Sequence, residues 1–487
     1  MPEARLDGWA ELTCSIVVTK RKKKSRKEVR RRPPPQDQLE GLPEGQVEPL
    51  ELGQPGCAIQ ADKTTYYLSS AVPGDQIRFQ PIRRKEPPYP ARLVKIIEAS
   101  EDRIVAPCSV LQTCGGCSIQ AMTYTAQLEA KTEALVRALD RLCQPKVIEP
   151  VTGLSEPFGY RTKLLMVAAP DGSRKPGKGA FALGFYSRAS TDLVHAGGCP
   201  VQHPLSLATL AMVEQVLSAF PITASKPRSS RGWLHGIGVR VDPQSGQSEV
   251  TLVGRSRKIP GGAALVEKLA SLPMVESVHL SVNPQRSSYL MGDSFEHLAG
   301  ARRMTFHIGK EAFLLSPGSF FQTSAEGASL LADQVMAALP PRMTQLADLY
   351  GGVGVFARLS RNRWKQATVV ESNPHAASDL RSWIRHTDQK GLKVLQGKVE
   401  DCMDKVLASK PDAVLLDPPR SGCHRRVIKA LGKSLPPVIV YVACGIEALV
   451  RDGRALKQAG YRIDRVTSVD MFPHTTHLEV VARFVLR

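Results

Sequence analysis

The last third of the chain alternates apolar runs of strand length with segments of helical periodicity. From about residue 325 the apolar runs are, in order, QLADLYGG, ATVVES, KVLQG, DAVLLDPPR, VIVYVAC, RIDRVTSV and LEVVARFVL, with helical patterns between most of them. This alternation predicts a doubly wound parallel sheet, a Rossmann-like α/β domain over residues 325–487. Ligands of such sheets bind beyond the carboxyl ends of the strands, so we expect the functional side chains there.

The earlier part of the chain has a different pattern. Residues 46–98 form short apolar runs broken by turn residues, which predicts a small β-barrel. Apolar and small residues at helical spacing predict a helix from Tyr124 to Leu142, and residues 158–323 read as a mixed α+β segment. We therefore expect a multi-domain α/β protein in four parts, namely a basic, disordered arm (1–45), a barrel (46–100), a central α+β domain (101–324) and the Rossmann-like domain (325–487).

The charge of the chain favours a polyanionic partner. Lys and Arg number 65 against 46 Asp and Glu, a formal net charge of +19. Part of the excess lies in KRKKKSRKEVRRR (20–32), and the barrel segment adds RRK at 83–85. Lys and Arg that neutralise phosphates release counterions, so nucleic acid suits this balance. The barrel tyrosines fit either its core or a base-stacking face: Tyr66, Tyr67 and Tyr89.

The chain contains no apolar run near the roughly 20 residues that span a bilayer, and its first residues lack the layout of a signal peptide. We expect a cytoplasmic monomer that makes no membrane contact. Thiols stay reduced in the cytosol, so its ten cysteines are not expected to form disulfides.

Chemistry-bearing residues follow several of the predicted strands. DLYGGVG has glycines at 351, 352 and 354, which permit a tight turn with bare backbone against a ligand. Glu371 closes the next strand, where an acid can accept ribose hydroxyls, and Asp417 closes a later one before two prolines. The glycines do not complete G-x-G-x-x-G, so a nucleoside without pyrophosphate fits better than a dinucleotide. S-adenosylmethionine is such a ligand. Arg420 follows the prolines where amino-methylating enzymes carry an aromatic residue, which favours methylation of a ring carbon.

A cysteine and a glutamate complete this predicted site. Cys444 ends the apolar strand VIVYVAC, where a buried structural thiol is the plain alternative to a nucleophile. A thiolate that adds to C6 of uracil makes C5 nucleophilic toward the methyl group of a sulfonium. Glu479 stands in the otherwise apolar LEVVARF, where an unpaired carboxylate is costly. We interpret it as the general base, the alternative being an ion pair with a neighbour such as Arg483.

Together these segments resemble the RNA uracil-5-methyltransferases, specifically the iron–sulfur-containing branch that acts on 23S rRNA. The similarity runs from about residue 46 to the end of the chain. It rests on PCSVLQTCGGCSIQ, SPGSFFQTS, DLYGGVGVFA, VVESNPHA, LLDPPRSG, YVACGIEALVRD and FPHTTHLE, in family order. The sequence departs from the family at Ala443, Gly445 and Ile446, where Ser, Asn and Pro are usual. The resemblance implies a TRAM-type barrel and a Rossmann-like methyltransferase domain. It also implies S-adenosylmethionine contacts from Gln322, Tyr350, Glu371 and Asp417, with Cys444 as nucleophile and Glu479 as base.

Three cysteines are crowded into residues 107–120. Cys108, Cys114 and Cys117 need a fourth partner to complete a metal site, and the candidates are Cys143 and Cys199. Cys199 precedes a proline in a loop-like context, and the resemblance places the fourth ligand there. Three local thiolates with one remote thiolate resemble a [4Fe–4S] arrangement, whereas zinc more often takes two close couplets.

The resemblance favours 23S rRNA as substrate, with a tRNA T-loop uridine as the alternative. Two further hypotheses are a catalytically silent RNA-binding assembly factor and a cytosine-5 methyltransferase.

Overall fold

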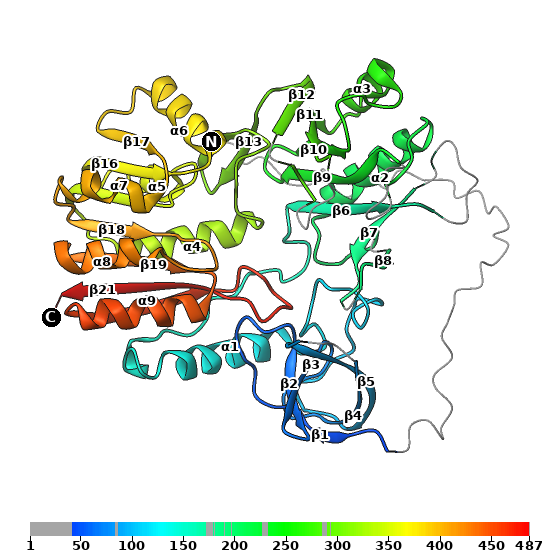
Figure 1. Ribbon diagram of the computed structural model, residues 1–487, viewed down its shortest axis with the longest axis horizontal. Helices are drawn as coiled ribbons and strands as arrows, with labels where there is room; N and C mark the ends of the chain where they lie inside the picture. Colours follow the sequence, from blue (N-terminus) through cyan, green and yellow to red (C-terminus); the bar gives the residue numbers. More distant parts are fainter. Residues whose placement is uncertain are drawn as a thin grey trace, which may run out of the picture. The chain divides into compact units, whose positions relative to one another are not determined.

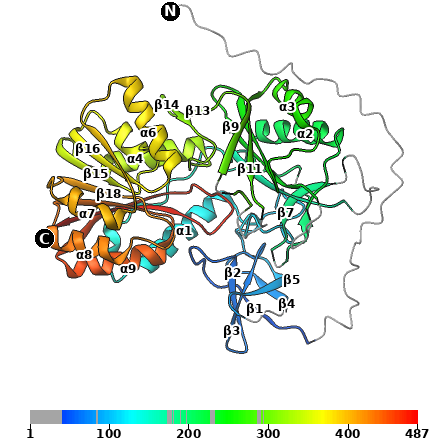
Figure 2. The ribbon, with the colours of Figure 1, turned by 45° about the horizontal axis from the view of Figure 1, so that its top comes forward.

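The computed structural model describes residues 41–82, 86–171, 179, 181–188, 190–195, 197–225, 232–284, 290–292 and 294–486, and these residues form four β-sheets (Figures 1 and 2). The unit that begins at Pro43 holds all four. Residues 1–40 of the expected arm and the RRK at 83–85 lie outside the described residues. No helix in the described part of the chain is both long and apolar enough to cross a membrane.

The C-terminal sheet has the strand order β17-β16-β15-β18-β19-β21-β20. Its strands are β15 (Met343–Leu349), β16 (Trp364–Glu371), β17 (Leu392–Gln396), β18 (Ala413–Leu416), β19 (Val438–Ala443), β20 (Tyr461–Val469) and β21 (Glu479–Leu486). β15 to β19 pair in parallel, which confirms the Rossmann-like core. Strand order reverses between β15 and β18, where a ligand crevice is expected.

The last strand departs from the parallel prediction. β21 pairs antiparallel with both β19 and β20. Only residues 470–478 connect β20 to β21. A parallel crossover needs a dozen residues or more, so the chain turns back and β21 inserts between its neighbours.

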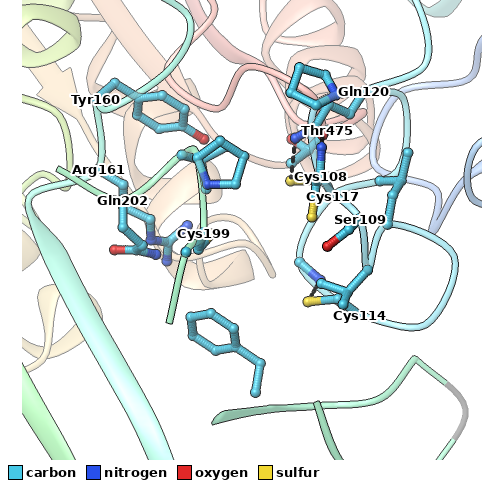
Figure 3. A pocket seen from close by; sticks show the side chains of 18 of the residues that line it. Cys108, Ser109, Cys114, Cys117, Gln120, Tyr160, Arg161, Cys199, Gln202 and Thr475 are labelled. Atoms are coloured by element: carbon cyan, nitrogen blue, oxygen red, sulfur yellow. Dashed lines mark hydrogen bonds between the residues drawn. The ribbon is translucent and has the colours of Figure 1, made fainter. Parts of the chain in front are cut away.

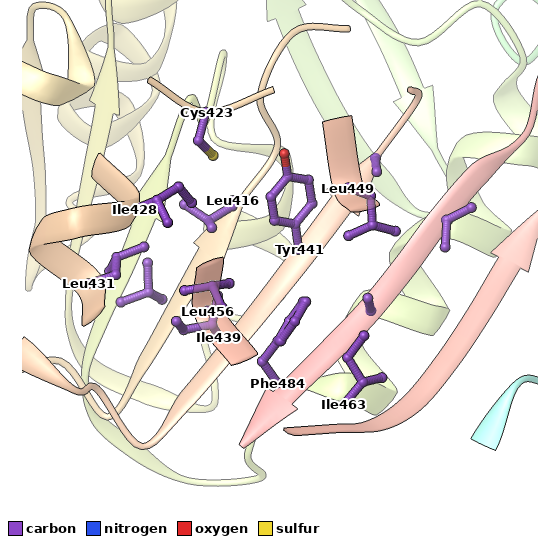
Figure 4. Close-up of a cluster of buried hydrophobic side chains, with 14 of the residues drawn as sticks. Leu416, Cys423, Ile428, Leu431, Ile439, Tyr441, Leu449, Leu456, Ile463 and Phe484 are labelled. Carbon is purple, nitrogen blue, oxygen red and sulfur yellow. The ribbon is translucent and has the colours of Figure 1, made fainter. Parts of the chain in front are cut away.

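Helices cover both faces of this sheet, which explains why its strands read as nearly continuous apolar runs. One face packs against α7 (Val399–Leu407), α8 (Arg425–Ser434), α9 (Ile446–Gln458) and, from far upstream, α1 (Tyr124–Leu139). Figure 4 shows this cluster around Tyr441 and Phe484. The other face packs against α4 (Ala325–Ala338), α5 (Val355–Leu359) and α6 (Pro374–Thr387). The helix predicted over 124–142 is present and ends at Leu139.

The central sheet has the order β12-β11-β10-β9-β6-β7-β8. Its strands are β6 (Lys163–Ala169), β7 (Ala182–Tyr186), β8 (Leu193–Val194), β9 (Leu234–Asp242), β10 (Gln247–Gly254), β11 (Val275–Val282) and β12 (Ser294–Gly300). Helices α2 (Pro204–Ser218) and α3 (Gly262–Ala270) share its core. A hairpin of β13 (Met304–Ile308) and β14 (Glu311–Leu315) follows. The mixed α+β prediction for this segment is confirmed in its element types.

The N-terminal sheet curls toward a barrel. It has the order β1-β4-β5-β3-β2, with strands β1 (Glu44–Gln46), β2 (Cys57–Ala61), β3 (Thr64–Leu68), β4 (Gln76–Pro81) and β5 (Tyr89–Glu98). The amide of Glu48 donates to the carbonyl of Ala58 (2.9 Å), which brings the two edges together. Tyr66 packs against the buried Phe79 with ring centroids 5.6 Å apart, so this tyrosine belongs to the core side. The domain limits drawn from the sequence stay predictions.

Candidate functional site

Four of the residues singled out from the sequence lie at one edge of the C-terminal sheet. Tyr350 follows β15, Glu371 ends β16, Asp417 follows β18 and Cys444 follows β19. The amide of Asp417 donates to the carbonyl of Leu349 (3.2 Å), so the loops after β15 and β18 start side by side. The parallel strands therefore bring the four residues to the edge where ligands bind.

Glu479 reaches the same edge from the opposite direction. β21 is antiparallel to β19, and Val480 pairs with Ala443. The next position of this register places Glu479 opposite Cys444. The carboxylate acts on the thiol electrostatically, since it contributes to raising the Cys444 pKa. The antiparallel turn that the sequence did not predict is thus what brings these two residues together.

The Glu479 carboxyl is buried, and its surroundings favour the protonated, neutral form. Burial, followed by the charge of Asp417, raises its pKa to about 8, while Arg420 opposes this. The alternative ion pair with Arg483 does not form, because Arg483 lies 3.9 Å from Asp464. Four residues along an extended strand span about 13 Å, which explains why Arg483 is out of reach.

Cys444 opens into a small pocket of about 140 Å³. Arg420 and His477 line it beside the thiol, and Leu52 and Gly53 reach it from the N-terminal part of the chain. A cavity of about 150 Å³ holds a benzene ring, so this pocket matches one pyrimidine ring. Burial, then Glu479 and Asp417, raise the pKa of the thiol to about 11, and Arg420 lowers it.

Gly445 lets the loop after the thiol approach the loop after β18 closely. A Cβ at this position would lie 2.7 Å from the carbonyl oxygen of Arg420. The loops after β18 and β19 therefore touch through bare backbone, which fixes Arg420 next to Cys444.

The glycine turn after β15 leaves open space beside carboxylates. Gly352 has φ 57° and a Cβ there would meet nothing within 4 Å, while its amide donates to Glu371 Oε2 (2.9 Å). Asp348 is fully buried, with Oδ2 accepting from the amide of Ala357 and Oδ1 without a partner. Burial and the neighbouring acids raise the pKa of Asp348 to about 8, and burial and Glu371 raise that of Asp417 to about 7. This concentration of acid suits a cationic ligand that carries hydroxyl donors.

Two further residues of the predicted cofactor site are held by their surroundings. Tyr350 has φ 61°, a conformation that non-glycine residues rarely adopt, and its hydroxyl accepts from the amide of His424 (3.4 Å). Gln322 is half-buried ahead of α4, and the next carbonyl, that of Thr323, accepts from the amide of Thr162 (2.8 Å). Tyr350 is therefore held by its own hydrogen bond, and Gln322 lies next to a held backbone position.

The four cysteines predicted as a quartet line one cavity of about 470 Å³ (Figure 3). Cys108, Cys114 and Cys117 come from one loop, and Cys199 comes from the segment before α2. Burial, followed by the other three thiols, raises the pKa of Cys117 to about 12, and Arg188 lowers it. The four thiols therefore influence one another across the cavity that they line.

The loop of the first three cysteines is fastened to the central domain. Gly115 donates its amide to the carbonyl of Tyr186 (3.3 Å), and Arg188 donates to the carbonyls of Cys114 and Cys117. Cys143 lines a different pocket beside Lys457, so it does not join the quartet. Among the described residues, no group of three or more His, Cys, Asp or Glu side chains has the spacing of a site for a metal ion.

Comparison with known proteins agrees with the geometry of the sheet edge. A sequence model of the family described as tRNA (Uracil-5-)-methyltransferase matches residues 404–484, which include Asp417, Cys444 and Glu479. An uncharacterized RNA methyltransferase of Halalkalibacterium halodurans is 31% identical over 435 residues, covering 88% of this chain and 93% of that protein. One of Enterococcus faecalis is 31% identical over 399 residues, covering 80% and 86%. The chain belongs to the RNA uracil-5-methyltransferase family.

A solved structure of an RNA methyltransferase resembles this chain over most of its length. The crystal structure of Pyrococcus abyssi tRNA (uracil-54, C5)-methyltransferase in complex with S-adenosyl-L-homocysteine superposes with a TM-score of 0.70 at 25% identity. The match covers 91% of this chain and 100% of that chain. The protein is thus an S-adenosylmethionine-dependent RNA (uracil-5-)-methyltransferase, as the sequence predicted.

Sequence reasoning left several residues of this methyltransferase's site without a role. His477 lines the Cys444 pocket, and burial lowers its pKa to about 4, so its ring is neutral. Its presence in FPHTTHLE was a signal that went unused. Asp348 was similarly visible beside the glycine turn. Nothing in the sequence pointed to Leu52 and Gly53, since they precede Cys444 by almost the whole chain.

Proposed function

We propose that this enzyme transfers a methyl group from S-adenosylmethionine to C5 of a uridine in RNA through a covalent adduct with Cys444. The thiolate forms a bond to C6, and the electron pair of the C5=C6 double bond moves to make C5 an enolate carbon. C5 then takes the methyl group from the sulfonium. The cofactor without its methyl group leaves as S-adenosylhomocysteine. Removal of the C5 proton returns its electron pair to the ring, the C6–S bond breaks, and the thiolate and 5-methyluridine separate. The register that sets Glu479 opposite Cys444 carries this proposal.

Glu479 is the group that removes the C5 proton. Its raised pKa makes it a stronger base than an ordinary glutamate, because the product proton rests on a carboxyl that prefers to be neutral. Arg420 supports the attack on C6, since its charge lowers the pKa of Cys444 and favours the thiolate. His477 is neutral, so it lines the pocket for the uracil with a polar ring that carries no charge.

The residues at the sheet edge fit S-adenosylmethionine. The open space over Gly352, the unpartnered Asp348 Oδ1 and the clustered acids Glu371 and Asp417 together suit ribose hydroxyls and a positive sulfonium. We assign Glu371 and Asp417 to contacts with the nucleoside, and Tyr350 and Gln322 to its flanks. When bound, the cofactor supplies the electrophilic methyl group.

The cysteine cavity fits a [4Fe–4S] cluster better than a single ion. Four thiols, those of Cys108, Cys114, Cys117 and Cys199, line one cavity of about 470 Å³. Four thiolates are the ligand set of a [4Fe–4S] cluster, so Cys108, Cys114, Cys117 and Cys199 would be the residues that hold it. The cluster supplies no step of methyl transfer. Its cysteines hold the loop that joins the barrel to α1.

We favour 23S rRNA as substrate, because the cysteine quartet resembles the ribosomal branch. A tRNA uridine is the second candidate, since the solved relative acts on uracil-54 of tRNA. The target base has to leave its stack to enter the 140 Å³ pocket, which favours a loop in either RNA. The TRAM assignment of the barrel, the domain limits, the monomeric state and the cytoplasmic location remain predictions from the sequence.

Tritium release from RNA labelled as [5-³H]uridine tests the reaction and its substrate together. Ribosomal RNA and tRNA from cells lacking this protein are incubated with enzyme and S-adenosylmethionine, and the modified nucleosides are identified by mass. 5-Methyluridine in rRNA supports the proposal, and 5-methyluridine in tRNA alone transfers it to the second candidate. 5-Methylcytidine would make the enzyme a cytosine-5 methyltransferase, and no release from any RNA would make it a silent assembly factor.

A further inference from the structure

His474 lies in the loop between β20 and β21 and is held through its backbone by distant parts of the chain. Its amide donates to Gln127 Oε1 of α1 (2.9 Å). Its carbonyl accepts from the amides of Ser118 (2.9 Å) and Ile119 (3.0 Å), which directly follow Cys117. Its φ of 67° is in the left-handed region that non-glycine residues avoid, so these contacts fix a strained conformation.

The side chain of His474 is fixed as firmly as its backbone. Nε2 lies 2.9 Å from the carbonyl oxygen of Pro157, and Nδ1 lies 3.2 Å from Gln127 Nε2. A carbonyl only accepts, so Nε2 carries the proton and Nδ1 accepts from the glutamine. The ring also stacks on Phe158 with centroids 4.3 Å apart. Burial lowers its pKa to about 4, so this neutral arrangement persists at neutral pH.

Both the oxygen and the nitrogen of the Gln127 side-chain amide hydrogen-bond to His474, and the nitrogen also bonds to the segment just before α1. The side chain is fully buried, its oxygen accepts from His474, and its nitrogen also donates to the carbonyl of Met122 (2.9 Å). Two more hydrogen bonds hold the same loop, and together with those of His474 and Gln127 they form what we call the clamp. Tyr160 donates its hydroxyl to the carbonyl of Pro473 (3.3 Å), and the amide of Gly53 donates to the carbonyl of Thr476 (3.0 Å).

The clamped loop leads directly into the reaction site. His477 lines the Cys444 pocket, and Glu479 begins β21 five residues after His474. Tyr160 and Thr475 line the cysteine cavity on the other side of the loop. Neighbouring residues of one loop therefore border both sites, Thr475 the cysteine cavity and His477 the Cys444 pocket, and this loop is held by α1 and by the cysteine loop.

We propose that Gln127 is a positioning residue for the base Glu479, acting through His474, and that the segment after Cys117 shares this task through the amides of Ser118 and Ile119. The inference rests on the proposed roles of Cys444 and Glu479. Gln127 touches neither the pocket nor the sheet edge. Loosening the clamp should displace the base while leaving the thiol on β19 in place, so it should slow proton removal more than adduct formation.

The test compares two reactions of the full-length enzyme. Adduct formation with 5-fluorouridine RNA needs Cys444 and the cofactor, whereas tritium release from [5-³H]uridine RNA also needs the base. Gln127→Met keeps a side chain of similar shape and removes the hydrogen bonds. Thr209→Ala, a buried hydrogen-bonding residue of α2, and Gln345→Met, a glutamine that pairs with Gln366 away from the site, serve as controls.

For Gln127→Met we expect adduct formation within about twofold of wild type and a fall of at least about tenfold in kcat for tritium release, because ångström misplacement of a reacting group costs that much or more. KM for RNA should stay unchanged, and the adduct with unmodified uridine RNA should accumulate. Both controls should behave as wild type. Equal loss in the two reactions, or tritium release within twofold of wild type, would overturn the proposal.

Two further measurements keep the result interpretable. If Gln127→Met does not fold, Phe158→Leu, which removes only the ring stacked on His474, is measured in the same way and should show the same selective loss; an unselective or absent effect overturns the proposal there too. Glu479→Gln is run in parallel. If that variant releases tritium normally, the assignment of the base itself is wrong, whatever Gln127→Met does.

Discussion

Glu479 occupies the position directly opposite Cys444 in the register of β19 and β21, because Val480 pairs with Ala443. The carboxylate so placed makes ionisation of the thiol more costly. Burial, then Glu479 and Asp417, raise the pKa of the thiol to about 11, and burial, then Asp417, raise that of the carboxyl to about 8. At neutral pH the free enzyme therefore holds both groups largely protonated. Bound S-adenosylmethionine would offset the negative charge of Asp417, and Arg420 already favours the thiolate.

Cys444→Ala should abolish the covalent complex with 5-fluorouridine RNA and lower methylation by at least about a thousandfold, since the nucleophile is lost. Denaturing gel electrophoresis of the RNA–protein complex measures this. Cys402→Ala, which removes a half-buried thiol of α7, is the matched control and should form the complex as wild type does. A complex that persists in Cys444→Ala would assign the nucleophile to another residue.

Glu479→Gln should uncouple the two halves of the reaction. The thiol still adds and the methyl group still transfers, but the C5 proton stays, so tritium release should fall by about 10²–10⁴-fold. The methylated adduct on ordinary uridine RNA should accumulate as a slow-migrating band. Normal turnover with no such band would show that another group removes the proton.

The same substitution should stabilise the protein in alkaline solution. The folded pKa of Glu479, about 8, lies above its ordinary value of 4.5, so the folded state prefers the protonated form. The stability that the Glu479 proton contributes is therefore fully present below pH 4.5 and is lost as pH rises through the folded pKa of about 8. Glu479→Gln removes this loss, so its denaturation midpoint should exceed that of wild type by more at pH 9 than at pH 6. A difference that does not grow with pH would show that the carboxyl is not perturbed.

The Rossmann-like core and the gathering of most candidate site residues were predictable because parallel strands bring their carboxyl ends to one edge. Tyr350, Glu371, Asp417 and Cys444 each follow an apolar run, and the sheet alone brings them together. The antiparallel β21 was not predicted, since periodicity shows that a strand exists but not in which direction it runs. The short 470–478 connection was the available signal, because it is too brief for a crossover.

The parts that escaped prediction depend on contacts across long stretches of sequence. Gln127 and His474 are buried partners separated by 347 positions, and no local pattern marks such a pair. Gly53 reaches the Cys444 pocket from the opposite end of the chain. Cys199 was separated from Cys143 as the fourth thiol by its proline-flanked loop and by the resemblance, and the structure places it in the cavity. Loops that meet through tertiary packing leave no periodic signal, so only the folded chain shows them.

Binding of S-adenosylmethionine should strengthen as pH rises through about 7. Burial and Glu371 hold the pKa of Asp417 near 7 in the free protein, and a positive ligand with hydroxyl donors prefers the ionised carboxylate. Affinity should therefore increase from pH 5.5 to 7 and level off above, as measured by calorimetry. Asp417→Asn should bind more weakly with a flatter profile. An unchanged pH profile in that variant would place the titrating group elsewhere, with Asp348 the next candidate.

Anaerobically purified enzyme should be brown, with broad visible absorbance and about four iron and four sulfide per chain. The other three thiols of the quartet all act on the pKa of Cys117, so Cys117→Ser should bleach the protein and lower its thermal stability. Cys143→Ser changes a thiol in a separate pocket and should keep the colour. If the loop after Cys117 also holds His474 through Ser118 and Ile119, bleached Cys117→Ser should lose tritium release more than adduct formation. A colourless wild-type protein that carries zinc would exclude the cluster and leave the cysteine cavity as a zinc site.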